Sequence, residues 1–201
     1  ALVSVITANN EVGTINPIRE IGALCHGRGV VFHTDATQAV GKLVLDVQAD
    51  HIDLLSLSSH KIYGPKGIGA LYVRRRDPQV RIKPLFDGGG HERGLRSGTP
   101  AVPLIVGLGE AIELALKDRA EDLPRIRGLR DRLETGIRER VRDVRLNGHP
   151  TDRLDGNLNL SFSYVDGEAL MMAMRDVAVS SGAACTSAEP EPSHVLRAMG
   201  L

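Results

Sequence analysis

The chain has 201 residues and carries 25 Lys and Arg side chains against 25 Asp and Glu, so its formal net charge is zero with neutral histidines. This balance argues against a nucleic-acid coat protein or a polybasic membrane anchor. Apolar residues at 42% and charged residues at 25% indicate a globular chain rather than a disordered or fibrous one, and the length allows one large domain or two small ones.

The two cysteines, Cys25 and Cys185, stand far apart and support neither a disulfide framework nor a structural zinc site. No uncharged run approaches the roughly 18 residues that a membrane helix needs, and the first residues lack the basic start of a signal peptide. We therefore expect a soluble, cytoplasmic protein with no membrane and no direct nucleic-acid partner. Position 1 is Ala and opens directly into a strand-like run, which predicts that the sequence is an internal part of a longer chain.

Short apolar runs alternate with a helical pattern in the first third of the chain, which predicts an α/β arrangement. A helix should begin after Pro17 and end at the glycines 27 and 29, because its apolar residues recur every three or four positions. With strands on either side of it, this helix forms a βαβ unit over residues 1–35, so its two strands should be parallel. The expected strands in this part cover residues 1–7, 30–32, 53–59 and 68–74.

The second half has a more helical pattern. Residues 103–116 read as a helix, and the charged segment after it places six apolar side chains on one stripe, namely Leu123, Ile126, Leu129, Leu133, Ile137 and Val141. Short strands are expected at 145–147, 157–163 and 177–181, with a helix at 167–175. We predict part of a large domain over residues 1–118 and part of a smaller α+β domain over residues 119–201.

Chemistry-bearing side chains follow two neighbouring strands of the first half. Asp35 ends one strand and Lys61 follows the next, and the carboxyl edge of an open α/β sheet is where ligands bind. A lysine with an aspartate one strand away suits pyridoxal phosphate, because the lysine forms a Schiff base and the aspartate keeps the pyridine nitrogen protonated. Solvated loop charges are the alternative. The glycine-rich pieces match no nucleotide-binding motif, and no histidine pair has the i, i+4 spacing of a metal site.

Five motifs follow one another along the chain, namely ANNEVGT at 8–14, HTDATQAVGK at 33–42, SHKIYGPKG at 59–67, GGGHERGLRSGT at 88–99 and SSGAACTS at 180–187. In this order they resemble the motifs of cysteine desulfurases, the NifS/IscS branch of the class-V aminotransferase family. This resemblance covers essentially the whole chain and implies the pyridoxal-phosphate-dependent transferase fold type I, with part of its large mixed-sheet domain and part of its small domain. The usual upstream phosphate loop and ring-stacking histidine, and the downstream substrate-binding arginine, are not found here.

The resemblance implies a role for each matched position. Lys61 would hold the cofactor covalently and then move the Cα proton of the substrate. Asp35 would pair with the pyridinium nitrogen, Gln38 would bond the ring hydroxyl oxygen, and Asn10 would line the same edge. The phosphate would be held by Ser58 and His60, with Thr99 supplied by the partner subunit of a homodimer. His60 would also be one of the catalytic residues, with Lys61 and Cys185.

Cys185 is the implied sulfur carrier. Its thiolate would take the sulfur of L-cysteine as a persulfide and leave L-alanine, and the small residues around it favour a segment that can swing. Cys25, on an apolar helix face, fits a buried core cysteine instead. The sulfur would pass to an iron–sulfur scaffold or a sulfur-carrier protein, where Cys185 could transiently contact the iron of a nascent cluster.

Two alternatives remain beside this interpretation. A selenocysteine lyase or another class-V pyridoxal phosphate enzyme would share Asp35, Gln38 and Lys61. The 201 residues alone could also be an inactive part that does not hold the cofactor. An arginine-rich stretch at 119–145 could bind an acidic partner such as a scaffold, although the solvated back of an amphipathic helix is the more ordinary interpretation.

Overall fold

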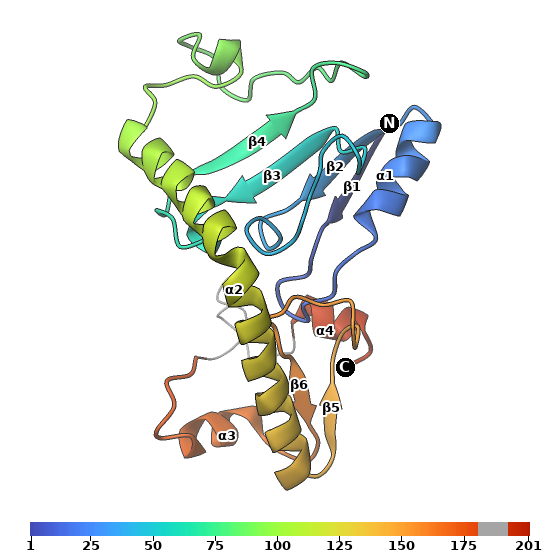
Figure 1. Ribbon diagram of the computed structural model, residues 1–201, viewed down its shortest axis with the longest axis vertical. Coiled ribbons are helices and arrows are strands. Elements are labelled where there is room, and N and C mark those ends of the chain that lie inside the picture. Colours follow the sequence, from blue (N-terminus) through green and yellow to red (C-terminus); the bar gives the residue numbers. More distant parts are fainter. Residues whose placement is uncertain (181–192) are drawn as a thin grey trace.

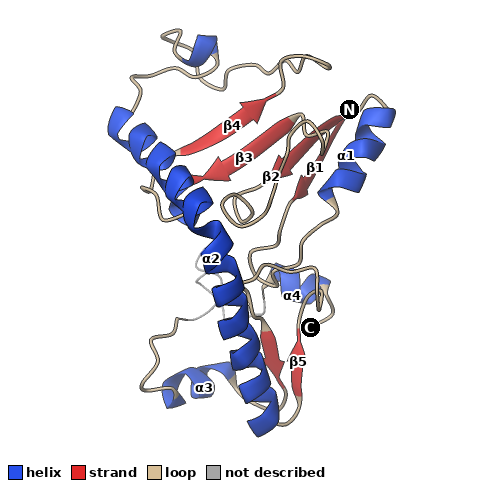
Figure 2. Ribbon diagram, in the orientation of Figure 1, coloured by secondary structure: helices blue, strands red, loops and turns tan. Residues whose placement is uncertain are grey.

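The computed structural model describes residues 1–180 and 193–201, and its two β-sheets are joined by one long helix (Figures 1 and 2). The first sheet carries the N-terminal half of the chain, and the second carries much of the C-terminal half. The elements of the first half are β1 (Leu2–Ile6), α1 (Ile18–Gly27), β2 (Val31–Asp35), β3 (Leu54–Ser58), the short helix η1 (Ser59–Lys61) and β4 (Gly69–Val73). Those of the second half are η2 (Glu92–Gly94), α2 (Val102–Arg140), β5 (Val144–Leu146), β6 (Leu160–Phe162), α3 (Gly167–Ala173) and α4 (His194–Ala198).

The four-stranded sheet has the order β1-β2-β3-β4. β1, β2 and β3 are parallel, and β4 runs antiparallel to β3. The expected βαβ unit with parallel strands is confirmed, as are the four strands of the first half to within a few residues at their ends. The mixed sheet with helices also confirms the predicted α/β class.

The core of this half lies between α1 and one face of the sheet. Ile18 and Cys25 of α1 pack with Phe32 of β2, Ile52 and Leu55, all of them buried. Cys25 is therefore a core residue, as its place on the apolar helix face predicts. Successive strand residues point to opposite faces, so the neighbours of Phe32 in β2 face away from α1.

Helix α2 has 39 residues and crosses from one half of the molecule to the other (Figure 1). At the helical rise its length is about 58 Å. Its first half packs Leu108 and Ala111 on Ile62 beside the large sheet. Its second half lies along the loop before β6, where the Arg127 guanidinium meets the Asp155 carboxylate at 2.7 Å. The helical patterns at 103–116 and beyond are thus one continuous helix that passes through Pro124.

The predicted apolar stripe lies on α2 from Leu123 to Ile137, whereas Val141 follows the end of the helix, and part of the stripe is exposed. Leu129 and Leu133 are 52% and 56% exposed, so these two side chains are not covered by the described residues. Helical periodicity fixes which side chains share a face, but it does not determine what packs on that face. The predicted domain boundary at 118 falls inside α2 and stays a prediction, because the helix runs through it without a break.

β5 and β6 form an antiparallel pair beside α2. The predicted strands at 145–147 and 157–163 are confirmed in shortened form, and the predicted helix at 167–175 is confirmed as α3. The predicted strand at 177–181 is wrong for residues 177–180, which join no sheet, and Ser181 lies outside the described residues.

Within residues 1–180 and 193–201, no helix combines the length and apolar character needed to cross a bilayer. The same residues contain no cluster of three His, Cys, Asp or Glu side chains that could hold a metal ion.

Candidate functional site

The three parallel strands end at one edge of the sheet, and the candidate residues leave from that edge. In the register Ile6 lies opposite Asp35, and Asp35 lies opposite Ser56. Backbone bonds continue the pairing one residue further, from Thr7 N to the Asp35 carbonyl at 2.8 Å and from Ala36 N to the Ser56 carbonyl at 2.9 Å. The loops that carry the polar motifs therefore begin side by side, as the strand-end pattern predicts.

Asp35 ends β2 as a half-buried carboxylate. Its Oδ1 accepts a hydrogen bond of 2.9 Å from Thr37 N, which orients the carboxylate at the strand end. Oδ2 remains to accept a bond from a further donor. A protonated ring nitrogen is a donor of that kind.

Gln38 lies in the turn after β2, three residues beyond Asp35. Its Oε1 accepts a hydrogen bond of 3.3 Å from Lys42 Nζ. Burial lowers the pKa of the Lys42 ammonium below its ordinary value, and the positive charge of Lys61 lowers it further. Gln38 and Lys42 therefore meet in the turn after β2, and the charge of Lys61, which follows the neighbouring strand β3, acts on Lys42.

Ser58 and His60 form a second pair at the end of β3. Ser58 Oγ and His60 Nδ1 share a hydrogen bond of 2.9 Å. The His60 ring is exposed, and Lys61 beside it is also exposed, so both side chains can reach a ligand. A hydroxyl and an imidazole that already contact each other are a suitable donor pair for a phosphate group.

The segment that carries Lys61 is held by a tight internal contact. Ser59, directly before His60, is fully buried, and its Oγ has no hydrogen-bond partner among the described residues. A methyl group added at Gly64 would lie 2.1 Å from that Oγ, so a residue with a side chain cannot stand there without displacement. Gly64 N also donates to the Ser59 carbonyl at 3.1 Å, which closes the turn around Lys61.

Asn10 lies exposed in the loop after β1. That loop is fixed from the other half of the chain, because Asn157 Nδ2 and Asn159 Nδ2 donate to the Glu11 carbonyl at 3.0 and 3.1 Å. The buried Arg153 donates from Nη2 to the Val12 carbonyl at 3.3 Å. The second half of the chain therefore holds the loop that carries Asn10 at the edge of the sheet.

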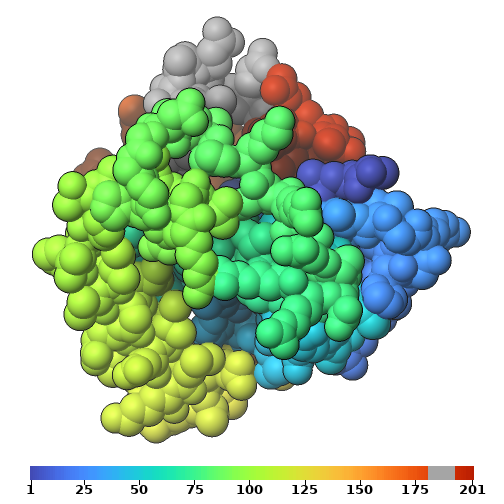
Figure 3. All heavy atoms as spheres, turned by 90° about the horizontal axis from the view of Figure 1, so that it is seen from above, coloured from blue at the N-terminus to red at the C-terminus, as the bar shows by residue number. Residues whose placement is uncertain are grey.

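Among the described residues, no hydrogen bond joins Thr99 to the other candidates. Thr99 is exposed in the segment between β4 and α2, which passes beyond β4 in Figure 1 and spreads as green atoms over the face seen in Figure 3. Its predicted place in the partner's site stays a prediction. Cys185, with its predicted sulfur and transient iron contacts, lies outside the described residues.

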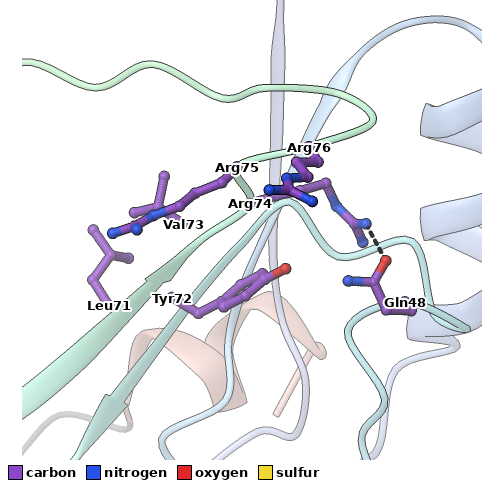
Figure 4. A pocket seen from close by; sticks show the side chains of 7 residues that line it. All are labelled: Gln48, Leu71, Tyr72, Val73, Arg74, Arg75 and Arg76. Atoms are coloured by element: carbon purple, nitrogen blue, oxygen red, sulfur yellow. Dashed lines mark hydrogen bonds between the residues drawn. The ribbon is translucent and has the colours of Figure 1, made fainter.

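A shallow hollow lies elsewhere, beside the end of β4, and is lined by Gln48 and by residues 71–76 (Figure 4). The Arg74 guanidinium in its wall is already engaged, because it donates to Gln48 Oε1 at 2.6 Å and pairs with Asp53 Oδ1 at 3.0 Å. This hollow adjoins the start of β3, whereas Lys61 follows its end. We therefore place the candidate site at the carboxyl edge of β1–β3 and not in the hollow.

Lys42, Ser59 and Gly64 lie within the motifs at 33–42 and 59–67, but sequence reasoning assigned them no role in this site. A signal for Lys42 was present, since it stands four residues after Gln38 in a turn, within reach of that side chain. The tight packing of Ser59 on Gly64 has no counterpart in composition or periodicity. It follows from how the chain turns after β3.

Comparison with known proteins agrees with this geometry. Residues 1–200 match the family described as Aminotransferase class-V. The chain is 58% identical over 200 residues to "Cysteine desulfurase, mitochondrial" of Drosophila melanogaster, with 100% of this chain and 43% of that protein covered. It is also 58% identical over 200 residues to "Cysteine desulfurase IscS" of Anaeromyxobacter dehalogenans, with 100% and 49% covered.

Among solved structures, the chain is similar to a NifS-like protein from Rickettsia africae. The TM-score is 0.85 at 32% sequence identity, with 100% of this chain and 52% of that chain covered. The chain thus spans about half the length of the curated relatives that it matches.

Proposed function

Because the chain belongs to the class-V aminotransferase family, we propose that it carries the lysine side of a pyridoxal phosphate site and works as part of a cysteine desulfurase. The observation that supports this proposal is the gathering of Asp35, Gln38 and Lys61 at one edge of a mixed sheet. Two relatives of the chain carry the name cysteine desulfurase, which favours this activity over others in the family.

The donors and acceptors at the edge fit the cofactor. The free oxygen of Asp35 accepts from a protonated pyridine nitrogen, while Ser58 and His60 supply donors for an anionic phosphate. Lys61, directly after His60, is an exposed primary amine. When bound, the cofactor supplies an electron sink that stabilises negative charge on the Cα of an amino acid substrate.

The residues of this chain have two tasks in the proposed reaction. Lys61 would hold the cofactor, and its amine would take the Cα proton of the substrate and return a proton to the product. The Cys185 thiolate attacks the substrate sulfur, so that the carbon–sulfur bond of L-cysteine breaks and a sulfur–sulfur bond forms on the protein. L-cysteine and one protein thiol thereby give L-alanine and one protein persulfide, and no external oxidant is needed.

The proposal is tested on the chain expressed with the native sequence that flanks it. This protein should show a Schiff-base absorbance with pyridoxal phosphate that Lys61→Ala removes, and it should release alanine from L-cysteine. Sulfur transfer at full rate by Cys185→Ala would overturn the persulfide step. Relative rates on cysteine and selenocysteine distinguish a desulfurase from a selenocysteine lyase, because selenium release depends less on a protein thiol.

The isolated 201 residues need a separate experiment. Spectral titration of this chain with pyridoxal phosphate shows whether it holds the cofactor without flanking sequence. We propose that it does not turn over cysteine alone, since the stacking histidine and the carboxylate-binding arginine of the family are absent from it. Turnover of cysteine by the isolated chain would contradict this.

We also propose a homodimer in which Thr99 completes the phosphate site of the partner, and transfer of sulfur to an iron–sulfur scaffold or a sulfur-carrier protein. The exposure of Thr99 leaves its side chain accessible to a second subunit, which supports this proposal. The cytoplasmic location stays a prediction, because the Drosophila relative is named mitochondrial.

A further inference from the structure

The turn after β2 is packed tightly against the segment that carries Lys61. Gly41 adopts φ +78, and a methyl group added there would lie 3.0 Å from Ala115 Cβ on α2 and 3.4 Å from Ile62 Cγ2. Positive φ and this close approach both favour glycine at position 41. The contact fixes the next residue, Lys42, beside the segment that begins with Lys61.

Backbone bonds hold the same turn from the other side. Ala39 is fully buried, and its carbonyl accepts from Lys42 N at 2.9 Å and from Leu43 N at 2.8 Å. Arg119 of α2 donates to the Leu43 carbonyl at 3.3 Å. The backbone of Lys42 is therefore held by the sheet end and by α2, so its side chain has a defined starting point.

The Lys42 side chain acts on Gln38. Its ammonium group has three donors and no acceptor, so only the oxygen of the Gln38 amide can face it. Lys42 Nζ donates to Gln38 Oε1 at 3.3 Å, which leaves the NH₂ group of Gln38 directed away from the ammonium. If the amide were flipped, its NH₂ group would meet the ammonium donor to donor, which is unfavourable.

We propose that Lys42 is a positioning residue of the cofactor site, which holds the oxygen of the Gln38 amide so that Gln38 presents its NH₂ group as a donor. This proposal rests on the proposed function, in which Gln38 bonds the ring hydroxyl oxygen of pyridoxal phosphate. An ionised ring oxygen needs a donor, and an amide that turned freely would present its oxygen instead for part of the time. Lys42 acts through Gln38 and is not itself a catalytic residue.

The test is a double-mutant cycle in the chain expressed with its native flanking sequence. Two quantities are measured, the dissociation constant of pyridoxal phosphate and the pH midpoint of the Lys61-dependent visible absorbance. Lys42→Met should weaken cofactor binding about tenfold, the size expected for one hydrogen bond to a charged group. It should also raise the pH midpoint, since the ionised ring oxygen loses a fixed donor. In a Gln38→Ala background the same substitution should change binding by less than about twofold, because the residue through which it acts is gone.

Two controls separate positioning from a general effect. Lys42→Arg keeps a cationic donor and should stay within about threefold of the unmodified protein. Lys117→Met removes an exposed lysine from α2 and should change neither quantity. If Lys42→Met lowers the yield of folded protein, Lys42→Gln keeps a neutral donor of similar length and should give an intermediate loss.

Three outcomes would overturn the proposal. In the first, Lys42→Met behaves like Lys117→Met. In the second, its effect is as large in the Gln38→Ala background as in the unmodified protein, which would show that it acts by charge or packing alone. In the third, the unmodified protein shows no Lys61-dependent absorbance. This third result would overturn the proposed function as well, whereas the first two would leave the proposed function intact.

Discussion

The buried ion pair between Arg74 and Asp53 gives the most direct test of what holds the large sheet together. Their side chains are 6% and 7% exposed, and Arg74 Nε lies 3.0 Å from Asp53 Oδ1. Asp53 Oδ2 also accepts from Phe32 N at 2.9 Å, so this carboxylate joins the ends of two strands. The perturbation is Asp53→Asn, which keeps the shape and an acceptor but removes the negative charge.

The magnitude follows from the burial of both partners. Breaking a buried pair leaves an uncompensated charge and costs about 3–5 kcal/mol. Arg74 keeps bonds to the Ile52 carbonyl, the Val47 carbonyl and Gln48 Oε1, which supports the lower end of that range. The exposed pair between Arg125 and Asp122 is a matched control, with 2.9 Å between its atoms and side chains 59% and 47% exposed. Asp122→Asn should cost less than about 1 kcal/mol.

The assay is urea-induced unfolding followed by far-ultraviolet circular dichroism, with thermal unfolding as a second measurement. A loss of 1 kcal/mol lowers the thermal unfolding midpoint of a chain of this size by about 2–4 °C. Asp53→Asn should therefore lower the thermal midpoint by roughly 6–12 °C, and Asp122→Asn should lower it by roughly 4 °C at most. A double variant with Asp53→Asn and Arg74→Met removes both charges, keeps an acceptor for Phe32 N, and should recover part of the loss. Equal losses for Asp53→Asn and Asp122→Asn would refute the claim that the buried charge pair is what matters.

Two further predictions concern local packing and pH. Gly64→Ala should destabilise the turn around Lys61 by about 1–3 kcal/mol and weaken cofactor binding, because the added methyl group would lie 2.1 Å from Ser59 Oγ. Gly109→Ala on α2, where nothing lies within 4 Å of the added group, should be neutral or slightly stabilising, and equal losses for the two variants in urea unfolding would contradict the packing argument. The pKa of Asp46 is lowered because its carboxylate accepts two backbone N–H bonds, so its contribution to stability is present above about pH 4 and is lost as the pH falls through the lowered pKa. Asp46→Asn resembles the protonated form and should therefore be less stable than the unmodified chain at pH 7. The difference in stability between the two proteins should narrow as the pH is lowered. A difference in stability that does not change with pH would rule out this carboxylate as the cause.

Much of the candidate site follows from the sequence for a simple geometric reason. Parallel strands that pair in register end at a common edge, so residues at their ends must lie near one another. Asp35 and Lys61 are therefore predictable neighbours from the positions of two apolar runs. The roles of these residues stay predictions, since they came from the resemblance, and so do the roles of Thr99 and Cys185.

Local patterns predict where the strands and helices of the first half lie, because apolar periodicity and the placement of Gly and Pro act over a few residues. Features that depend on partners distant in the chain follow from packing instead. Residues 177–180 have strand-like composition but join no sheet, since strand preference takes effect only where a neighbouring strand or surface is available. Arg153 donates to the carbonyl of Val12, 141 positions earlier, and the turn before Lys42 packs against Ile62 and Ala115 because position 41 is a glycine. Such contacts depend on how the elements pack, which no local pattern specifies.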